Sequence, residues 1–117
     1  MRIFLCDDSH SFAAAVGFWL EEADDLDLVG IAHDRAGALA GLPAAQADVV
    51  LLDTMGGGGH GLAVDDVRAA SGGAKVVVYS GHEPGAARQF VSGEPARFLH
   101  KGDEPDHLID ALRSLNG

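Results

Sequence analysis

Short apolar runs alternate along the chain with longer stretches in which apolar side chains recur every three or four positions. The runs at 49–52 (VVLL) and 76–79 (VVVY) lack polar alternation, which is typical of parallel strands covered on both faces. Strands are expected at residues 2–6, 26–32, 49–52, 75–79 and 97–100, and the middle helices at 35–42, 62–70 and 84–92. This alternation predicts βαβ units, and therefore an α/β fold with a doubly wound, five-stranded parallel sheet.

The first and last helical segments are the most clearly amphipathic. The first, at residues 11–22, carries an apolar face made of Phe12, Val16, Trp19 and Leu20. In the last, Asp103 is expected to cap the helix and Pro105 suits its first turn. The first helix is therefore expected to pack on the sheet, and the last carries an apolar stripe of Leu108, Ile109, Leu112 and Leu115.

Length and composition limit the possible functions. A chain of 117 residues is expected to form a single domain, 1–117. Eighteen acidic against eight basic residues give a net charge of −10, the wrong sign for binding nucleic acid directly. The only cysteine, Cys6, excludes an internal disulfide. No apolar run is long enough to cross a membrane or to resemble a secretory leader, so a cytoplasmic location without membrane contact is expected.

Polar residues stand where four of the expected strands end: Asp7, Asp8, Asp53, Ser80 and Lys101. Because ligands of doubly wound sheets bind beyond the carboxyl ends of the strands, these side chains are expected to meet at one edge. Crowded carboxylates repel one another, and a hard divalent cation such as Mg²⁺ relieves that repulsion. A lysine and a hydroxyl beside the metal can bind phosphoryl oxygens, so the set suits phosphoryl transfer.

The order of these residues on five βα units resembles the receiver domains of response regulators in two-component signalling. The matching segments cover essentially the whole chain: LCDD at 5–8, VVLLD at 49–53, VVVYSG at 76–81 and FLHK at 98–101. The resemblance implies the flavodoxin-like (βα)5 fold. It further implies a phosphorelay signalling switch rather than an enzyme with an external substrate, because such a domain catalyses only its own phosphotransfer and dephosphorylation.

The resemblance also assigns roles to individual residues. It implies that Asp53 accepts the phosphoryl group and that Lys101 neutralises the developing charge. It implies that Mg²⁺ or Mn²⁺ is held by Asp8, Asp53 and the backbone carbonyl of Met55, with Asp7 acting through water. Ser80 and Phe98 would then be the switch residues, which change the surface around the fourth helix, fifth strand and fifth helix.

The same resemblance implies the kinds of partner that the domain contacts. The donor is expected to be a histidine kinase or a phosphotransfer protein, and the recipient of the signal an output domain or a downstream protein. A homodimer through the surface formed by the fourth helix, fifth strand and fifth helix is also consistent with it. The segments LVGIA at 28–32 and KGDEP at 101–105 are similar to the LuxR/NarL branch, whose members usually carry a helix-turn-helix output domain.

One segment departs from the usual receiver pattern. Where most receivers have a Met-Pro pair after the acceptor, this chain has four glycines, Gly56 to Gly59. Glycine loses more conformational entropy than other residues when it is ordered, so this loop is expected to be mobile without phosphate and metal. Met55 and His82 occupy the positions that flank the phosphoryl group in the family and govern the lifetime of the phosphorylated state. An apolar Met55 favours slow hydrolysis.

Two other functions stay open at this point. A haloacid-dehalogenase-like phosphatase also uses an aspartyl phosphate, but its motif needs a second aspartate where this chain has Met55, which cannot exchange a proton. A degenerate receiver acting as a phosphorylation-independent interaction module is suggested by the glycine loop, whereas the complete set of polar residues argues against it.

Overall fold

A computed structural model describes residues 1–53 and 63–115, apart from the side chains of Pro84 and Phe90. Strands and helices alternate through the described part in the order β1 (Arg2–Cys6), α1 (His10–Glu21), β2 (Asp27–Ala32), α2 (Arg35–Ala45), β3 (Val49–Leu52), α3 (Val64–Ala70), β4 (Lys75–Ser80), α4 (Pro84–Ala87), the 3-10 helix η1 (Arg88–Phe90), β5 (Arg97–His100) and α5 (Pro105–Ser114). The predictions for Met55 and for Gly56 to Gly59 lie outside the described residues.

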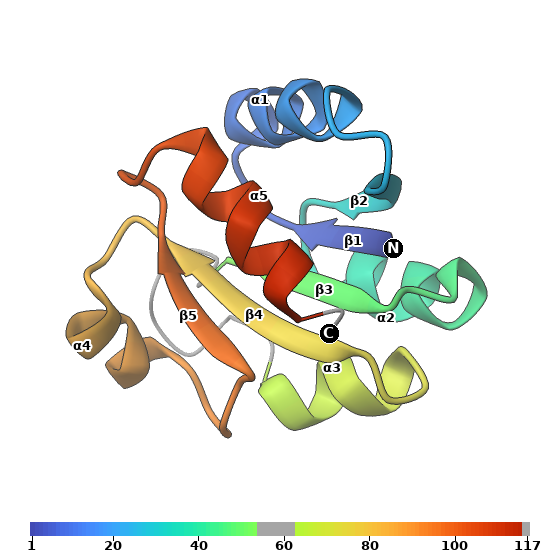
Figure 1. The fold of residues 1–117 in the computed structure, drawn as a ribbon. Coiled ribbons are helices and arrows are strands. Elements are labelled where there is room, and N and C mark those ends of the chain that lie inside the picture. The colour runs from blue at the N-terminus through green and yellow to red at the C-terminus, as the bar shows by residue number, and fades with distance from the viewer. Residues whose placement is uncertain (54–62, 116–117) are drawn as a thin grey trace.

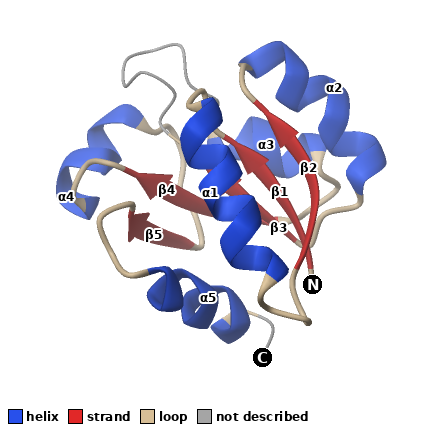
Figure 2. Cartoon of the chain, turned by 90° about the horizontal axis from the view of Figure 1, so that it is seen from above, coloured by secondary structure: helices blue, strands red, loops and turns tan. Residues whose placement is uncertain are grey.

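All five strands form one parallel sheet in the order β2-β1-β3-β4-β5. Helices α1 and α5 cover one face of this sheet, and α2 and α3 cover the other (Figure 1). The same two layers are visible from above, where α4 lies beside the β4–β5 end of the sheet (Figure 2). The predicted doubly wound, five-stranded α/β fold is therefore confirmed.

The sheet divides the apolar core into two clusters. The cluster under α1 and α5 includes Ile3, Leu5, Val16, Leu20, Leu51, Val77, Tyr79, Leu108 and Leu112. The cluster under α2 and α3 includes Phe4, Cys6, Leu42, Val50, Leu52, Val64, Val67, Val76 and Val78. Alternate residues of β1, β3 and β4 thus enter opposite clusters, which explains why these strands are apolar at nearly every position.

Side chains fix the ends of the helices that flank β1. The Ser9 hydroxyl accepts a hydrogen bond from the backbone N–H of Phe12 and caps α1. At the far end of α2, the Arg2 guanidinium donates to the carbonyls of Ala45 and Gln46, where the chain leaves the helix with Gln46 at φ 52°. Arg2 therefore joins the start of β1 to the end of α2, using carbonyls that a helix end leaves unsatisfied.

Two details of the sequence prediction were wrong. Glu104, not Asp103, precedes the first residue of α5, and its side chain makes no capping hydrogen bond, although Pro105 begins the helix as predicted. The fourth helix, expected at 84–92, is an α-helix only over Pro84–Ala87 and continues as η1. Gly85 lowers helix propensity in this single turn, and the 3-10 turn brings Arg88 over the Phe98 ring.

Candidate functional site

The site lies at the carboxyl ends of the strands, where Lys101 joins two carboxylates. The Lys101 ammonium lies 2.7 Å from Asp7 Oδ2 and 3.1 Å from Asp53 Oδ1. Asp7 follows β1, Asp53 follows β3 and Lys101 follows β5, so residues from distant parts of the sequence meet because their strands run parallel in one sheet. This is the convergence that the strand-end positions predict.

The site holds the buried polar side chains of the described part of the chain. Asp7 and Ser80 are fully buried and Asp53 is 8% exposed, whereas the other buried residues there are apolar. Buried charges need compensation, and the Lys101 side chain, itself only 16% exposed, supplies it. The described residues contain no buried side-chain nitrogen or oxygen without a hydrogen-bond partner. The buried polar atoms of the cluster are therefore all hydrogen-bonded.

Asp7 is fixed from three directions. Its Oδ1 accepts from the backbone N–H of Ser9 at 2.9 Å, and its own N–H donates to the Ala32 carbonyl at 2.9 Å. The Nδ1 atom of His33 lies 2.8 Å from the Asp7 carbonyl oxygen, and the His33 ring stacks on that of His10 at a centroid distance of 3.6 Å. Sequence reasoning did not single out this histidine pair, because isolated histidines after a strand and at a helix start carry no recognisable spacing.

Asp7, Asp8 and Asp53 lie close enough together to contribute ligands to one hard divalent cation. One carboxylate oxygen from each lies within 4.8 Å of the others. Asp7 and Asp53 are buried and Asp8 is exposed, so the cluster is open to solvent on one side. A set of carboxylate oxygens that can also keep water ligands fits Mg²⁺ or Mn²⁺. Asp7, Asp8 and Asp53 could therefore hold the ion.

Ser80 and His82 extend the site along β4 and the turn after it. The Ser80 hydroxyl accepts a hydrogen bond from the backbone N–H of His82 at 3.1 Å. Ser80 is buried at the end of its strand, whereas the His82 side chain is exposed. A serine hydroxyl can donate one hydrogen bond while it accepts another.

Phe98 belongs to β5, and the side chain of Arg88 lies over its ring. The Arg88 guanidinium lies 4.6 Å from the centroid of the half-buried Phe98 ring, which is a cation–π contact. The same guanidinium pairs with the Glu94 carboxylate at 2.9 Å. Sequence analysis missed Arg88 because its segment was expected to be regular helix.

Burial alters the acidity of two groups in the core beside the site. Burial, with a smaller contribution from the Asp7 charge, raises the pKa of the Cys6 thiol to about 12. Burial also raises the pKa of Tyr79 to about 12, helped by the negative charges of Asp103 and Asp7. Both side chains are therefore neutral at physiological pH, and neither adds a charge to the site.

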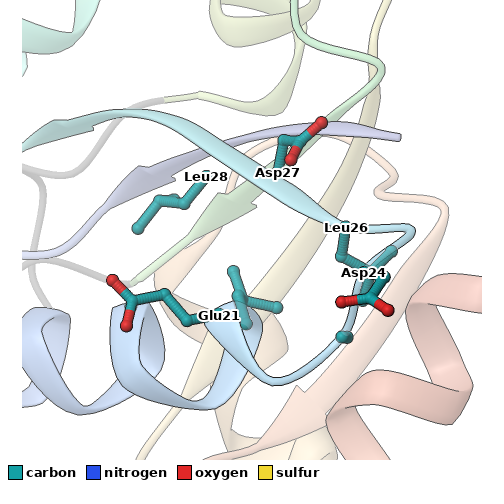
Figure 3. Close-up of a pocket in the computed structure, with 8 residues that line it drawn as sticks. Glu21, Asp24, Leu26, Asp27 and Leu28 are labelled. Carbon is teal, nitrogen blue, oxygen red and sulfur yellow. The ribbon is translucent and has the colours of Figure 1, made fainter.

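A separate hollow of about 450 Å³ lies between the end of α1 and β2. Glu21, Asp24, Leu26, Asp27 and Leu28 are among the residues that line it (Figure 3). The hollow is near the amino end of β2, whereas Lys101 follows the carboxyl end of β5 in the same parallel sheet. It contains none of the predicted site residues.

Comparison with known proteins gives matches among solved structures only. No protein-family model and no curated protein sequence matches the chain. The signal receiver domain of NarL from Mycobacterium tuberculosis is 29% identical, with a TM-score of 0.74 over 97% of this chain and 94% of that one. RcsB from Salmonella enterica serovar Typhimurium, bound to the promoter rprA in the presence of the phosphomimetic BeF3⁻, is 18% identical, with a TM-score of 0.79 over 100% and 99% of the two chains.

A third match is a response regulator from Burkholderia pseudomallei with a phosphorylated aspartic acid, a calcium ion and citrate. It is 17% identical, with a TM-score of 0.73 over 99% of this chain and 72% of that one. The chain thus has the fold of the receiver domains of response regulators, as its sequence motifs predict. Within that class it resembles receivers of the NarL, LuxR and RcsB type.

Proposed function

We propose that residues 1–117 form one receiver domain of a phosphorelay, which accepts a phosphoryl group on Asp53 from the phosphohistidine of a histidine kinase or phosphotransfer protein. The observation that carries the proposal is the Lys101 ammonium between the carboxylates of Asp7 and Asp53. It lies beside the atom that would receive the phosphoryl group. The structural neighbours support a receiver role.

The reaction exchanges one bond to phosphorus for another. A carboxylate oxygen of Asp53 forms the new O–P bond as the N–P bond of phosphohistidine breaks, and the leaving imidazole nitrogen keeps the electron pair and takes up a proton. Asp7, Asp8, Asp53 and the carbonyl of Met55 would hold Mg²⁺, which when bound supplies positive charge to the phosphoryl oxygens. Lys101 supplies the second positive charge, from a side chain that is only 16% exposed.

Ser80 and Phe98 would connect the chemistry to the surface. The Ser80 hydroxyl would donate a hydrogen bond to a phosphoryl oxygen, and Phe98 would turn inward, changing the surface formed by α4, β5 and α5. That surface is the proposed contact for an output domain, a downstream protein or a second copy of the chain. In the switch, phosphorylation shifts the populations of two conformations. Met55 and His82 would set the lifetime of the phosphorylated state.

A phosphorylation assay tests the proposal. The protein is incubated with acetyl phosphate and Mg²⁺, and mass spectrometry is expected to show one phosphoryl increment that Asp53→Asn abolishes. Asp66→Asn is the matched control, because Asp66 is an exposed aspartate of α3 that forms an ion pair with Arg35 at 3.6 Å. Absence of an adduct on the wild-type protein would favour the phosphorylation-independent module. Repeated turnover of a phosphorylated metabolite would favour the phosphatase.

A further inference from the structure

Phe12 lies against the cation of the site, although it belongs to the apolar face of α1. The Lys101 ammonium lies 4.3 Å from the centroid of the Phe12 ring, well inside the distance at which the face of an aromatic ring attracts a cation. An ammonium group has three N–H donors, and two of the directions around Lys101 are occupied by Asp7 and Asp53. The Phe12 ring covers a third side.

The capping turn at the start of α1 fixes Asp7 and Phe12 relative to each other through two hydrogen bonds. Asp7 Oδ1 accepts from the Ser9 N–H at 2.9 Å, and the Ser9 hydroxyl accepts from the Phe12 N–H at 3.2 Å. The other oxygen of Asp7 and the ring of Phe12 then meet at Lys101. One short turn therefore supplies both a carboxylate and an aromatic face to the same ammonium, which fixes its position from two sides.

Neighbouring aromatic rings hold the Phe12 ring in this orientation. Tyr79 packs against it with the centroids 5.5 Å apart, and Trp19 meets it edge-on at 5.8 Å. Tyr79 belongs to the buried core, so the ring rests on a rigid support. An aliphatic side chain could fill the same space, but it has no electron-rich face to offer a cation.

We propose that Phe12 is a positioning residue for Lys101, which holds the ammonium beside Asp53 through a cation–π contact and excludes water from it. This inference rests on the proposed phosphorylation of Asp53. Without the ring, water would compete for the ammonium, and Lys101 would be less often in the position that neutralises the charge of the transferring phosphoryl group.

Ring fluorination tests the electrostatic part of the proposal. Replacing Phe12 by fluorinated phenylalanines withdraws charge from the ring face while keeping the shape of the side chain, so packing is preserved where Phe12→Leu alone could disturb it. The rate of phosphorylation by acetyl phosphate is expected to fall progressively with fluorine content, and by about 2- to 30-fold in Phe12→Leu. Phe18→Leu, the same substitution at an exposed position of the same helix, is expected to keep the wild-type rate.

A second measurement separates this inference from the proposed function. In NMR spectra of the wild-type protein, the Hε protons of Lys101 should be shifted upfield by the Phe12 ring, with Lys75 as the internal reference, and Phe12→Leu should remove that shift. An unshifted Lys101 would overturn the inference whatever the phosphorylation result. A shifted Lys101 in a protein that forms no aspartyl phosphate would overturn the proposed function alone. Wild-type rates throughout the fluorinated series would also refute the positioning role.

Discussion

Replacement of Lys101 by methionine should remove a large part of the stability of the domain. At an effective dielectric constant of about 20, charge pairs at 2.7 and 3.1 Å are worth roughly 6 and 5 kcal/mol before desolvation. Desolvation of the ammonium opposes most of this attraction. The remaining loss comes mainly from the fully buried Asp7 carboxylate, which the substitution leaves without its cation. Breaking a buried ion pair in this way costs about 3–5 kcal/mol of unfolding free energy. The total unfolding free energy of a typical domain is only about 5–15 kcal/mol.

Urea unfolding followed by circular dichroism measures this loss. Lys75→Met is the matched control, because the exposed Lys75 side chain donates to the backbone carbonyl of Leu115 and not to a buried carboxylate. That variant is expected to lose no more than about 1 kcal/mol. Addition of Mg²⁺ should stabilise Lys101→Met more than the wild-type protein, since the three carboxylates then lack the ammonium that offsets their charge. Equal losses in the two variants would refute the reasoning.

Three further results are expected. Arg88→Ala should shift the ring resonances of Phe98 in NMR spectra but lower the unfolding free energy by only about 1 kcal/mol, because the cation is exposed. The hydrogen bond from Arg113 lowers the pKa of Asp25 below its ordinary value of 3.8. The pair therefore stabilises the fold above pH 3.8, and this stabilisation is lost as the pH falls through the lowered pKa of Asp25. Arg113→Gln should therefore weaken the dependence of the unfolding free energy on acid pH. Cys6, with a pKa of about 12, should react with a thiol reagent only on unfolding, whereas labelling at the rate of a free thiol in the folded state would contradict its burial.

The strands and the meeting of the site residues could be predicted from the sequence, because both depend on short-range patterns. Uninterrupted apolar runs identified β3 and β4, and the parallel topology then required Asp53 and Lys101 to lie at one edge. The start of α5 and the length of α4 could not be predicted in this way. For α4, the segment after the helix makes a contact between residues separated in sequence, that of Arg88 with the Phe98 ring, which a local pattern does not report.

Phe12 shows the same limit within the site. Its spacing on α1 indicated only an apolar face packed on the sheet, which is correct, since the ring packs against the core. The contact with Lys101 joins residues at opposite ends of the chain and depends on the exact depth of the ammonium below the surface. Periodicity reports the side of a helix that is buried, but not which buried residue faces a charge.

Because the sheet separates the two core clusters, a mutation in one cluster should leave the packing of the other unchanged. Substitutions under α1 and α5 change packing around Val16, while those under α2 and α3 change packing around Val67, and the two positions belong to different clusters. Losses of stability from such a pair should therefore add. The two sides of the molecule can accumulate sequence changes independently, provided that the strands between them keep their register and continue to deliver Asp7, Asp53 and Lys101 to one edge.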